Sequence, residues 1–172
     1  GRPIDAVFPH WGAPATPGPV LLRVEGVTGR RVRDVSFELR AGEVLGIAGL
    51  AGSGRSELLR IIGGASRAVA GTVTLDGTAF RPGSPGAAHR AGVAVVPQER
   101  RTQALTPDTV ERNLNATTID RQAIGGLIAS PRRERAHAQG LWDRFHLRGH
   151  GLGQEVLTLS GGNQQKVVLA KF

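Results

Sequence analysis

The sequence contains no cysteine, no methionine and no tyrosine. Without cysteine, disulfide bonds and thiolate metal sites are excluded. The sequence also lacks an apolar run of about eighteen residues, the length that a membrane-spanning helix needs, and it shows no signal-peptide pattern. Because position 1 is not methionine, we expect the 172 residues to be part of a longer chain. They suffice for one domain with a sizeable core.

Aromatic residues are scarce, with two tryptophans and five phenylalanines. This is little for a surface that stacks the bases of single-stranded nucleic acid. The formal net charge is +8, and of the 22 basic residues only Lys166 and Lys171 are lysines. A basic balance favours anionic partners, namely nucleotides, nucleic acid or the inner membrane surface.

The stretch Gly49–Ser56 is a glycine-rich loop between an apolar run and a helix-like run. It fits the pattern G-x-x-x-x-G-K-[ST] except that Arg55 stands where lysine is expected. In such a loop, backbone N–H groups surround phosphate oxygens, the next helix offers its positive N-terminus and the hydroxyl binds Mg²⁺. Residues 44–50 are predicted to form a buried strand and residues 56–62 a helix. A plain glycine-rich turn is the alternative, and this strand-loop-helix context disfavours it.

Hydrophobic periodicity and turn residues predict the other elements. Strands are expected at 20–27, 32–39, 71–75 and 93–96, and helices from Ser84 to Arg90, from Thr109 to Ala116 and from Ser130 onward. In the last helix, the apolar face is formed by Ala138, Leu141, Trp142 and Phe145. The proline-rich residues 1–19 are expected to be a linker or docking tail.

A second glycine-containing motif, LSGGNQQK, occupies residues 159–166. It places a hydroxyl and two glycines before another helix-like run, which predicts a second helix N-terminus with exposed backbone donors. Taken alone, L-S-G-G is short and could be a common turn. Its occurrence downstream of the phosphate loop makes a second anion site the better interpretation.

The segments GLAGSGRSEL, VVPQERR and LSGGNQQK resemble the ATP-binding-cassette (ABC) family, whose signature sequence is L-S-G-G-Q. The particular variants closely resemble the ATP-binding subunits of bacterial monosaccharide importers of the ribose, galactose and xylose type. Within these subunits they are similar to the second of two fused cassettes. The resemblance covers most of residues 1 to 172, and the opening GRP is similar to the end of the segment that joins the two cassettes.

The resemblance implies an α/β fold, a P-loop NTPase of ABC type. Such a fold has an antiparallel β subdomain, a partial parallel-sheet core and a helical subdomain. Residues 1–19 would be the linker from the preceding cassette and 20–98 the nucleotide-binding β subdomain with the P-loop core. Residues 99–159 would be the helical subdomain, and 160–172 the signature motif with the start of its helix.

The family's site residues carry over onto the matching positions. The resemblance implies that ATP is bound by Gly49, Gly52, Ser53, Gly54, Arg55 and Ser56, and by the signature residues Ser160, Gly161, Gly162 and Gln164. Mg²⁺ would be held by Ser56 and Gln98. The resemblance implies catalytic roles for Gln98, which would also contact the permease, and for Ser160 and Gly162 of the signature.

Three departures from the family pattern bear on function. Residues 27–32 contain no aromatic ring to lie against adenine, and Phe37 is better explained as core. Arg55 keeps the positive charge of the usual lysine but as a wide planar fork. The strand with the Mg²⁺-binding aspartate and the later switch histidine are expected only beyond Phe172. We therefore expect an incomplete parallel sheet with uncovered apolar surface and, for these residues alone, little ATPase activity.

The resemblance implies an ATPase that couples hydrolysis to monosaccharide import at the cytoplasmic face of the bacterial inner membrane. In this family each ATP lies between one phosphate loop and the opposite signature. The expected partners are the preceding cassette, a transmembrane permease and, indirectly, a sugar-binding protein. A non-catalytic nucleotide-binding module remains the alternative. ABC proteins of nucleic-acid machinery insert long coiled coils, for which the interval from Gly54 to Ser160 leaves no room, so no nucleic-acid partner is expected.

Overall fold

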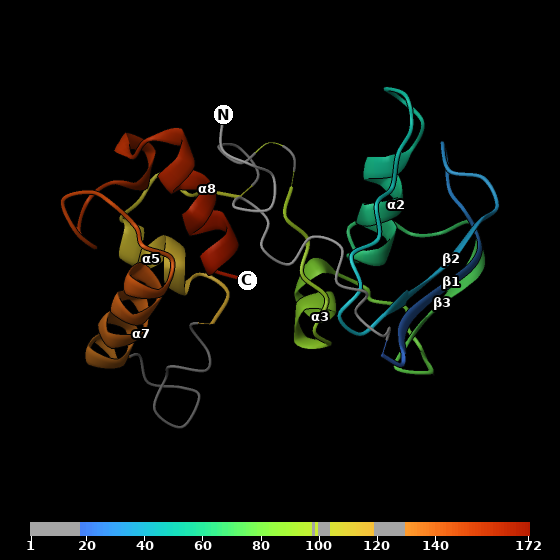
Figure 1. Ribbon diagram of the computed structural model, residues 1–172, viewed down its shortest axis with the longest axis horizontal. Coiled ribbons are helices and arrows are strands. Elements are labelled where there is room, and N and C mark those ends of the chain that lie inside the picture. The colour runs from blue at the N-terminus through green and yellow to red at the C-terminus, as the bar shows by residue number, and fades with distance from the viewer. Residues whose placement is uncertain (1–17, 98, 100–103, 119–129) are drawn as a thin grey trace, which may run out of the picture. The chain divides into compact units, whose positions relative to one another are not determined.

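The computed structural model describes residues 18–97, 99, 104–118 and 130–172. The expected linker therefore lies almost wholly outside the described residues, as does Gln98. The chain divides into two compact units, and the boundary falls between Val95 and Val96 (Figure 1). The phosphate loop belongs to the first unit and the signature motif to the second.

The first unit is built on a four-stranded sheet with the order β2-β1-β3-β4. Its strands are β1 (Val20–Thr28), β2 (Val35–Arg40), β3 (Ala70–Leu75) and β4 (Thr78–Ala79). All three pairings are antiparallel. The turn between β3 and β4 has positive φ at Asp76 (47°) and Gly77 (72°), as a two-residue hairpin turn requires. The antiparallel part of the predicted fold is thus confirmed.

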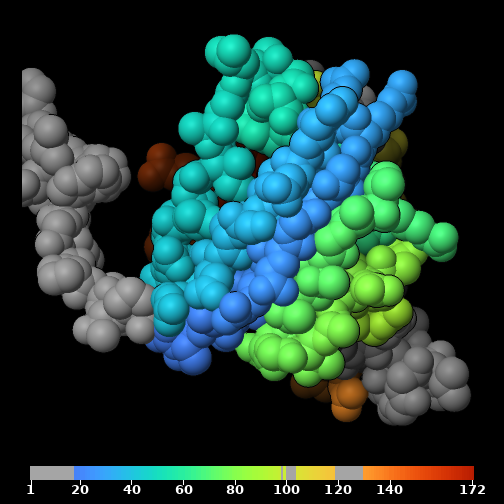
Figure 2. All heavy atoms as spheres, turned by 90° about the vertical axis from the view of Figure 1, so that its right-hand side faces the viewer, coloured from blue at the N-terminus to red at the C-terminus, as the bar shows by residue number. Residues whose placement is uncertain are grey.

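One face of the sheet is apolar and covered by helix α2 (Arg55–Ile62). The alternating residues Leu22 and Val24 of β1 are buried on this face, together with Leu58 and Ile61 of α2. Figure 2 shows β2, β1 and β3 as neighbouring bands, and the outer face of these strands carries polar side chains such as Glu25 and Thr72. There Arg23 forms an ion pair with Glu38 at 2.8 Å. Because these side chains are half exposed, the pair contributes little stability, and apolar burial against α2 stabilises the layer.

A bulge in β1 keeps the apolar side chains of this strand on the buried face of the sheet. The pairing of β1 shifts register between Val24 and Val27, so Val27 is also buried although it lies three positions after Val24. Gly26 lies in the bulge with a φ of 59°, a conformation that glycine adopts without strain. Gly71 of β3 packs directly against the Gly26 backbone, and any side-chain carbon at Gly71 would overlap the Gly26 carbonyl.

The predicted strands at 44–50 and 93–96 are wrong for this structure. Neither segment pairs with another strand among the described residues. Val44 is 96% exposed and Leu50 is 86% exposed. From residue 44 to 52 the described backbone takes part in one hydrogen bond, from the Ser53 N–H to the Leu50 carbonyl. Their apolar composition suits a strand buried on both faces of a parallel sheet, which forms only when neighbouring strands supply hydrogen bonds.

Helix α3 (Pro85–Arg90) follows the sheet and begins as predicted. The Ser84 hydroxyl accepts a hydrogen bond from the Ala87 N–H at 3.2 Å, and proline occupies the first helical position. Both features satisfy or remove the unpaired donors of a helix start.

The second unit is helical. It contains α5 (Val110–Asn115), α7 (Pro131–Arg144), the 3₁₀ turn η1 (Val156–Thr158) and α8 (Gly161–Ala170). Helix α5 contacts both α7 and α8, and the core between them includes Leu114, Ala138 and Val167. The predicted apolar face of α7 is confirmed, since Leu141, Trp142 and Phe145 pack against this core. Buried Asn113 and Asn115 hold adjoining backbone groups by side-chain hydrogen bonds.

Substitution of Gly71 by alanine tests the bulge contact. We expect Gly71→Ala to lower the free energy of unfolding by about 2 kcal/mol or more, because the φ of 87° disfavours alanine and the new carbon would overlap β1. Gly83→Ala is the matched control, since its φ is ordinary and nothing lies within 4 Å of the added carbon. Chemical denaturation of both variants is the measurement. Equal effects at the two positions would contradict this account of the bulge.

Candidate functional site

The glycine-rich loop ends at the N-terminus of α2 in a shape that requires glycine. Gly52 has a φ of 84° and Gly54 a φ of 93°, both in the left-handed region. Gly54 is also the N-cap of α2. A side-chain carbon on it would lie 2.9 Å from Val32 Cγ2 and 3.1 Å from the Arg31 carbonyl. The start of the helix is therefore held directly against the loop between β1 and β2.

The first turn of α2 presents unpaired backbone donors. The first intrahelical hydrogen bond runs from the Leu58 N–H to the Gly54 carbonyl at 2.9 Å, and no side chain caps the helix. The N–H groups of Arg55, Ser56 and Glu57 thus have no acceptor in the described part of the chain. Such a helix start, with its partial positive charge, suits a bound anion.

Two side chains that are expected to contact the nucleotide project from this turn. Arg55 and Ser56 are both exposed, and the Arg55 guanidinium has no hydrogen-bond or ion-pair partner among the described residues. Arg60 lies one turn further along the helix, and its Nε donates to the Ser56 carbonyl at 3.2 Å. Positive charge therefore gathers at this end of the helix.

Glu57 joins the helix to the β1–β2 loop, and sequence reasoning missed it. Its carboxylate accepts the Arg30 N–H at 2.8 Å and the Arg31 N–H at 2.6 Å. These hydrogen bonds, the one from Arg31 first and then the one from Arg30, lower the pKa of Glu57 below its usual value. A glutamate at the third helical position is common as a local cap, but the sequence offers no signal for a pairing with residues so far away in the chain.

The signature motif forms a second exposed helix start, at α8. Ser160 is its N-cap, and Ser160, Gly161 and Gly162 are exposed. The first intrahelical bond runs from the Gln164 N–H to the Ser160 carbonyl at 2.9 Å. The N–H groups of the three residues before Gln164 therefore lack intrahelical acceptors. Nothing lies within 4 Å of a carbon added at Gly162, so the packing of this chain does not itself require glycine there.

Gln164 does not lie where a nucleotide-binding residue would. It is fully buried, and its Nε2 donates to the Leu157 carbonyl at 3.0 Å and to the Leu159 carbonyl at 2.9 Å. The expectation of a direct ligand contact is therefore corrected. Burial of an amide requires hydrogen-bonded partners, and Gln164 uses its amide to hold the segment that leads into the signature.

Asn163, which the sequence analysis did not single out, is the polar side chain beside the signature hydroxyl. Its Nδ2 donates to the Ser160 Oγ at 3.0 Å, and its Oδ1 accepts the Arg148 N–H at 3.1 Å. Asn163 occupies the place of the final residue in the family's L-S-G-G-Q pattern, and this position could have indicated it.

The expected site residues thus form two groups. Gly49, Gly52, Ser53, Gly54, Arg55 and Ser56 lie together at the start of α2 in the first unit, and Ser160, Gly161 and Gly162 lie together at the start of α8 in the second. Gln98, the expected Mg²⁺ ligand and catalytic residue, lies outside the described residues.

The donors at the start of α2 fit the phosphates of a nucleotide. Left-handed glycines, free N–H groups and an exposed arginine together provide an anion cradle. For Mg²⁺ the exposed Ser56 hydroxyl is a suitable hard oxygen ligand. The described residues contain no cluster of three or more His, Cys, Asp or Glu that could hold a metal without the phosphates. In the same part of the chain, no helix combines the length and the apolar character that crossing a bilayer requires.

An antiparallel sheet, a glycine-rich loop that opens a helix and a separate helical unit define a phosphate-binding α/β protein. The sequence pattern of the family described as "ABC transporter" matches residues 32–172. The chain belongs to the ABC transporter family.

Curated relatives have related names. The chain is 45% identical over 174 aligned positions to "Ribose import ATP-binding protein RbsA 2" of Streptomyces coelicolor, covering 100% of this chain and 33% of that protein. It is 40% identical to "Ribose import ATP-binding protein RbsA" of Chromobacterium violaceum, covering 100% of this chain and 34% of that protein. The chain thus spans about a third of the length of these relatives.

Solved structures share the fold. CbiO1 from Clostridium perfringens, part of the ABC transporter complex cbiONQ, superposes with a TM-score of 0.68 at 18% identity, covering 88% of this chain and 60% of that one. A nucleotide-free ATP-binding cassette from an ABC transporter also gives a TM-score of 0.68, at 23% identity, covering 89% of this chain and 64% of that one. The predicted fold class, a P-loop NTPase of ABC type, is confirmed.

The Glu57 bridge predicts a pH-dependent contribution to stability. A carboxylate whose pKa is lower in the folded than in the unfolded state stabilises the fold. The stabilisation is complete when the pH is above the pKa of the unfolded state, 4.5. The contribution is lost as the pH falls through the folded value. We therefore expect Glu57→Gln to lower the free energy of unfolding at pH 7 and to differ progressively less from the parent protein below pH 4.5. Glu155→Gln is the control, because its exposed carboxylate makes no hydrogen bond or ion pair in the described part. A pH-independent difference for Glu57→Gln would refute the bridge.

Gln164 and Gln165 offer a matched pair on α8. We expect Gln164→Leu to lower the free energy of unfolding by about 1–3 kcal/mol, because two buried carbonyls lose their donor. Gln165→Leu, at an exposed position of the same helix, should change it by less than about 0.5 kcal/mol. Chemical denaturation followed by circular dichroism measures both, and similar values would show that Gln164 does not hold the signature segment.

Proposed function

We propose that this chain is one ATP-binding cassette of a bacterial sugar importer, acting with a second cassette and a permease. One observation carries the proposal. The chain has two exposed helix starts with unpaired N–H groups, and each is formed by one of the two motifs that define the family. The names of the relatives, which are ribose import ATP-binding proteins, support the sugar-import role.

The phosphate loop would bind the nucleotide. In this proposal the N–H groups of Arg55, Ser56 and Glu57 donate to phosphate oxygens, and Ser56 with Gln98 holds Mg²⁺. The bound Mg²⁺ would neutralise charge on the β- and γ-phosphates. The loop at 29–33, fixed by Glu57, lies next to this helix start, and it would flank the nucleotide without an aromatic ring.

The signature would serve the facing cassette. Phosphoryl transfer depends on positioning and charge stabilisation more than on covalent chemistry. Ser160 and the N–H groups of the two following glycines would direct donors at the γ-phosphate bound on the opposite phosphate loop. Because Gly162 is in open space, that position is free to approach a phosphate closely.

Arg55 suggests that the two sites of the assembly are unequal. A lysine ammonium is compact and fits between β- and γ-phosphates, whereas a guanidinium is wide and planar. The site on this chain's own loop would therefore bind ATP and hydrolyse it poorly. The intact signature would complete the efficient site on the other cassette.

We assign residues 20–98 to the nucleotide-binding subdomain, 99–159 to the helical subdomain and 160–172 to the signature segment. The boundary between the compact units, after Val95, lies close to the first of these limits. In the complete protein the cassette would lie on the cytoplasmic face of the inner membrane, beside the permease.

A non-catalytic nucleotide-binding module is the second candidate. It is favoured by Arg55, which stands at the position where the family pattern has lysine. The purified 172-residue chain should bind ATP without turnover under either proposal. Turnover by this chain alone would contradict both.

Paired substitutions in the complete two-cassette protein separate the two roles. We expect Gly162→Asp to lower ATPase activity by about 100-fold or more, because a carboxylate would face the transferring phosphate. Arg55→Ala should cost much less. Steady-state phosphate release at saturating ATP is the measurement.

Gly153→Asp is the matched control, because Gly153 is exposed in the same unit and nothing lies within 4 Å of an added carbon. It should leave ATPase activity near the parent value. If Gly162→Asp and Arg55→Ala were equally damaging, the division of labour would be wrong. If Gly162→Asp had no effect, the module proposal would replace the first.

A further inference from the structure

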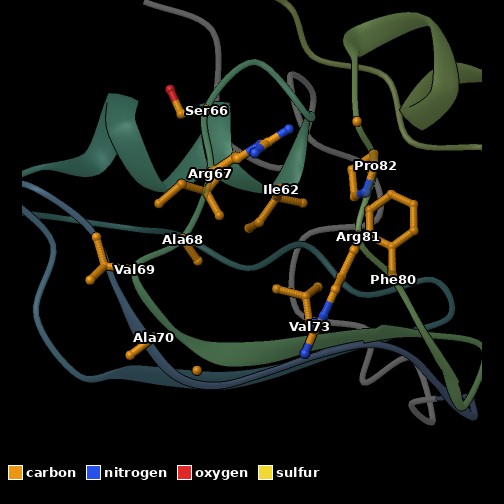
Figure 3. Close-up of a pocket in the computed structure, with 13 residues that line it drawn as sticks. Ile62, Ser66, Arg67, Ala68, Val69, Ala70, Val73, Phe80, Arg81 and Pro82 are labelled. Atoms are coloured by element: carbon orange, nitrogen blue, oxygen red, sulfur yellow. The ribbon is translucent and has the colours of Figure 1, made fainter.

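Converging polar contacts distinguish the start of α8 from the pocket of the first unit. That pocket has a volume of about 450 Å³ and is lined in part by the C-terminal end of α2 and the segment 80–83 (Figure 3). Arg67 and Arg81 line it as well, but both are exposed and their guanidinium groups are directed to opposite ends of the pocket. No ligand chemistry follows from that arrangement. Around the Ser160 hydroxyl, by contrast, each hydrogen bond has a defined direction.

The loop that follows α7 is attached to α8 at two positions. The Arg148 N–H donates to Asn163 Oδ1 at 3.1 Å. One helical turn further along α8, the Lys166 ammonium donates to the His146 carbonyl at 2.9 Å. Between these contacts, Leu147 is buried in the core of the unit. The Arg148 N–H is therefore held beside the first turn of α8.

The contact with Arg148 determines the orientation of the Asn163 amide. A backbone N–H only donates, so the atom of Asn163 that faces it must be the oxygen, Oδ1. The amide nitrogen Nδ2 then faces Ser160 Oγ, at 3.0 Å. Because an amide nitrogen only donates, Ser160 Oγ accepts this hydrogen bond. The proton of the Ser160 hydroxyl therefore points away from Asn163.

The Ser160 proton has no acceptor in the part of the chain that the structure describes. Ser160 is exposed, and its side chain makes no capping hydrogen bond with the first turn of α8. The hydroxyl is therefore available to donate to a ligand, beside the N–H groups of Gly161 and Gly162. A hydroxyl that accepts a hydrogen bond is also a stronger donor, because hydrogen bonds in a chain polarise one another.

We propose that Asn163 is a positioning residue that directs the Ser160 proton toward the γ-phosphate held by the facing cassette. The inference rests on the proposed function, in which Ser160 donates to that phosphate. Asn163 does not contact the nucleotide in this account. It acts through Ser160, and the Arg148 N–H in turn keeps the Asn163 amide from reversing.

Substitutions in the complete two-cassette protein test the direction of this hydrogen bond. Asn163→Leu removes the Nδ2 donor without adding charge, and kcat for ATP hydrolysis should fall by roughly fivefold with little change in KM, as expected for the loss of one neutral hydrogen bond. Asn163→Asp is nearly isosteric, but its second oxygen would accept the Ser160 proton and turn it away from the phosphate. It should lower kcat by roughly fiftyfold. Gln165→Leu, at an exposed position of the same helix, should leave kcat unchanged.

Ser160→Ala separates the positioning role from folding and from added charge. Alone, it should lower kcat by roughly tenfold or more, since it removes one donor to the transferring phosphate. In the Ser160→Ala background, Asn163→Leu should lower kcat by less than about twofold. Asn163→Asp should also cost several-fold less there than in the parent protein, because only the repulsion of its negative charge remains.

Two results would overturn the inference in distinguishable ways. If Ser160→Ala left kcat unchanged, the proposed role of the signature would fail and the inference with it. If Ser160→Ala lowered kcat but each Asn163 variant cost the same fold-change with and without the hydroxyl, the role of Asn163 alone would be wrong. Circular dichroism of each variant ensures that a lower kcat is not lost folding.

Discussion

Backbone N–H groups without acceptors at the starts of α2 and α8 are the constraint on which both candidate sites depend. A helix start always leaves such donors, and most proteins satisfy them with a side-chain cap, as Ser84 does for α3. Here neither Gly54 nor Ser160 provides one. The surrounding structure instead holds the two starts open, through Glu57 at one and through Asn163 and Gln164 at the other.

The sequence predicted much of this arrangement because the local signals are strong. Alternation in β1 and β2, the Asp76-Gly77 turn, the Ser84-Pro85 cap and the apolar face of α7 each rest on residues close together in the chain. The bridges that shape the sites were not predictable in this way. Glu57 pairs with the backbone of Arg30 and Arg31, and Gln164 reaches back to carbonyls outside its helix. Neither pairing has a sequence period.

Residues 44–50 and 93–96 were predicted to be strands and are not strands in the structure. They show that apolar composition alone is not sufficient to predict a strand. The segment 44–50 has the apolar composition of a buried strand, yet Val44 and Leu50 are almost fully exposed. A strand depends on neighbouring strands for its hydrogen bonds. A segment can therefore have the residues typical of a strand and still not form one when no neighbouring strand pairs with it. In the antiparallel sheet, β1 with β2 and β3 with β4 are joined by short connections, whereas β1 pairs with β3 although β2 and α2 lie between them in the chain.

The sparse hydrogen bonding from residue 44 to 52 has a thermodynamic consequence. An anion that orders this stretch must offset a backbone entropy of about 1 kcal/mol for each residue fixed. A contact that orders the same residues before the anion binds would remove this entropy cost. It would raise the affinity for the anion without itself contacting the anion. By linkage, a contact that orders residues 44–52 and an anion bound at the start of α2 would each raise the affinity for the other by the same factor.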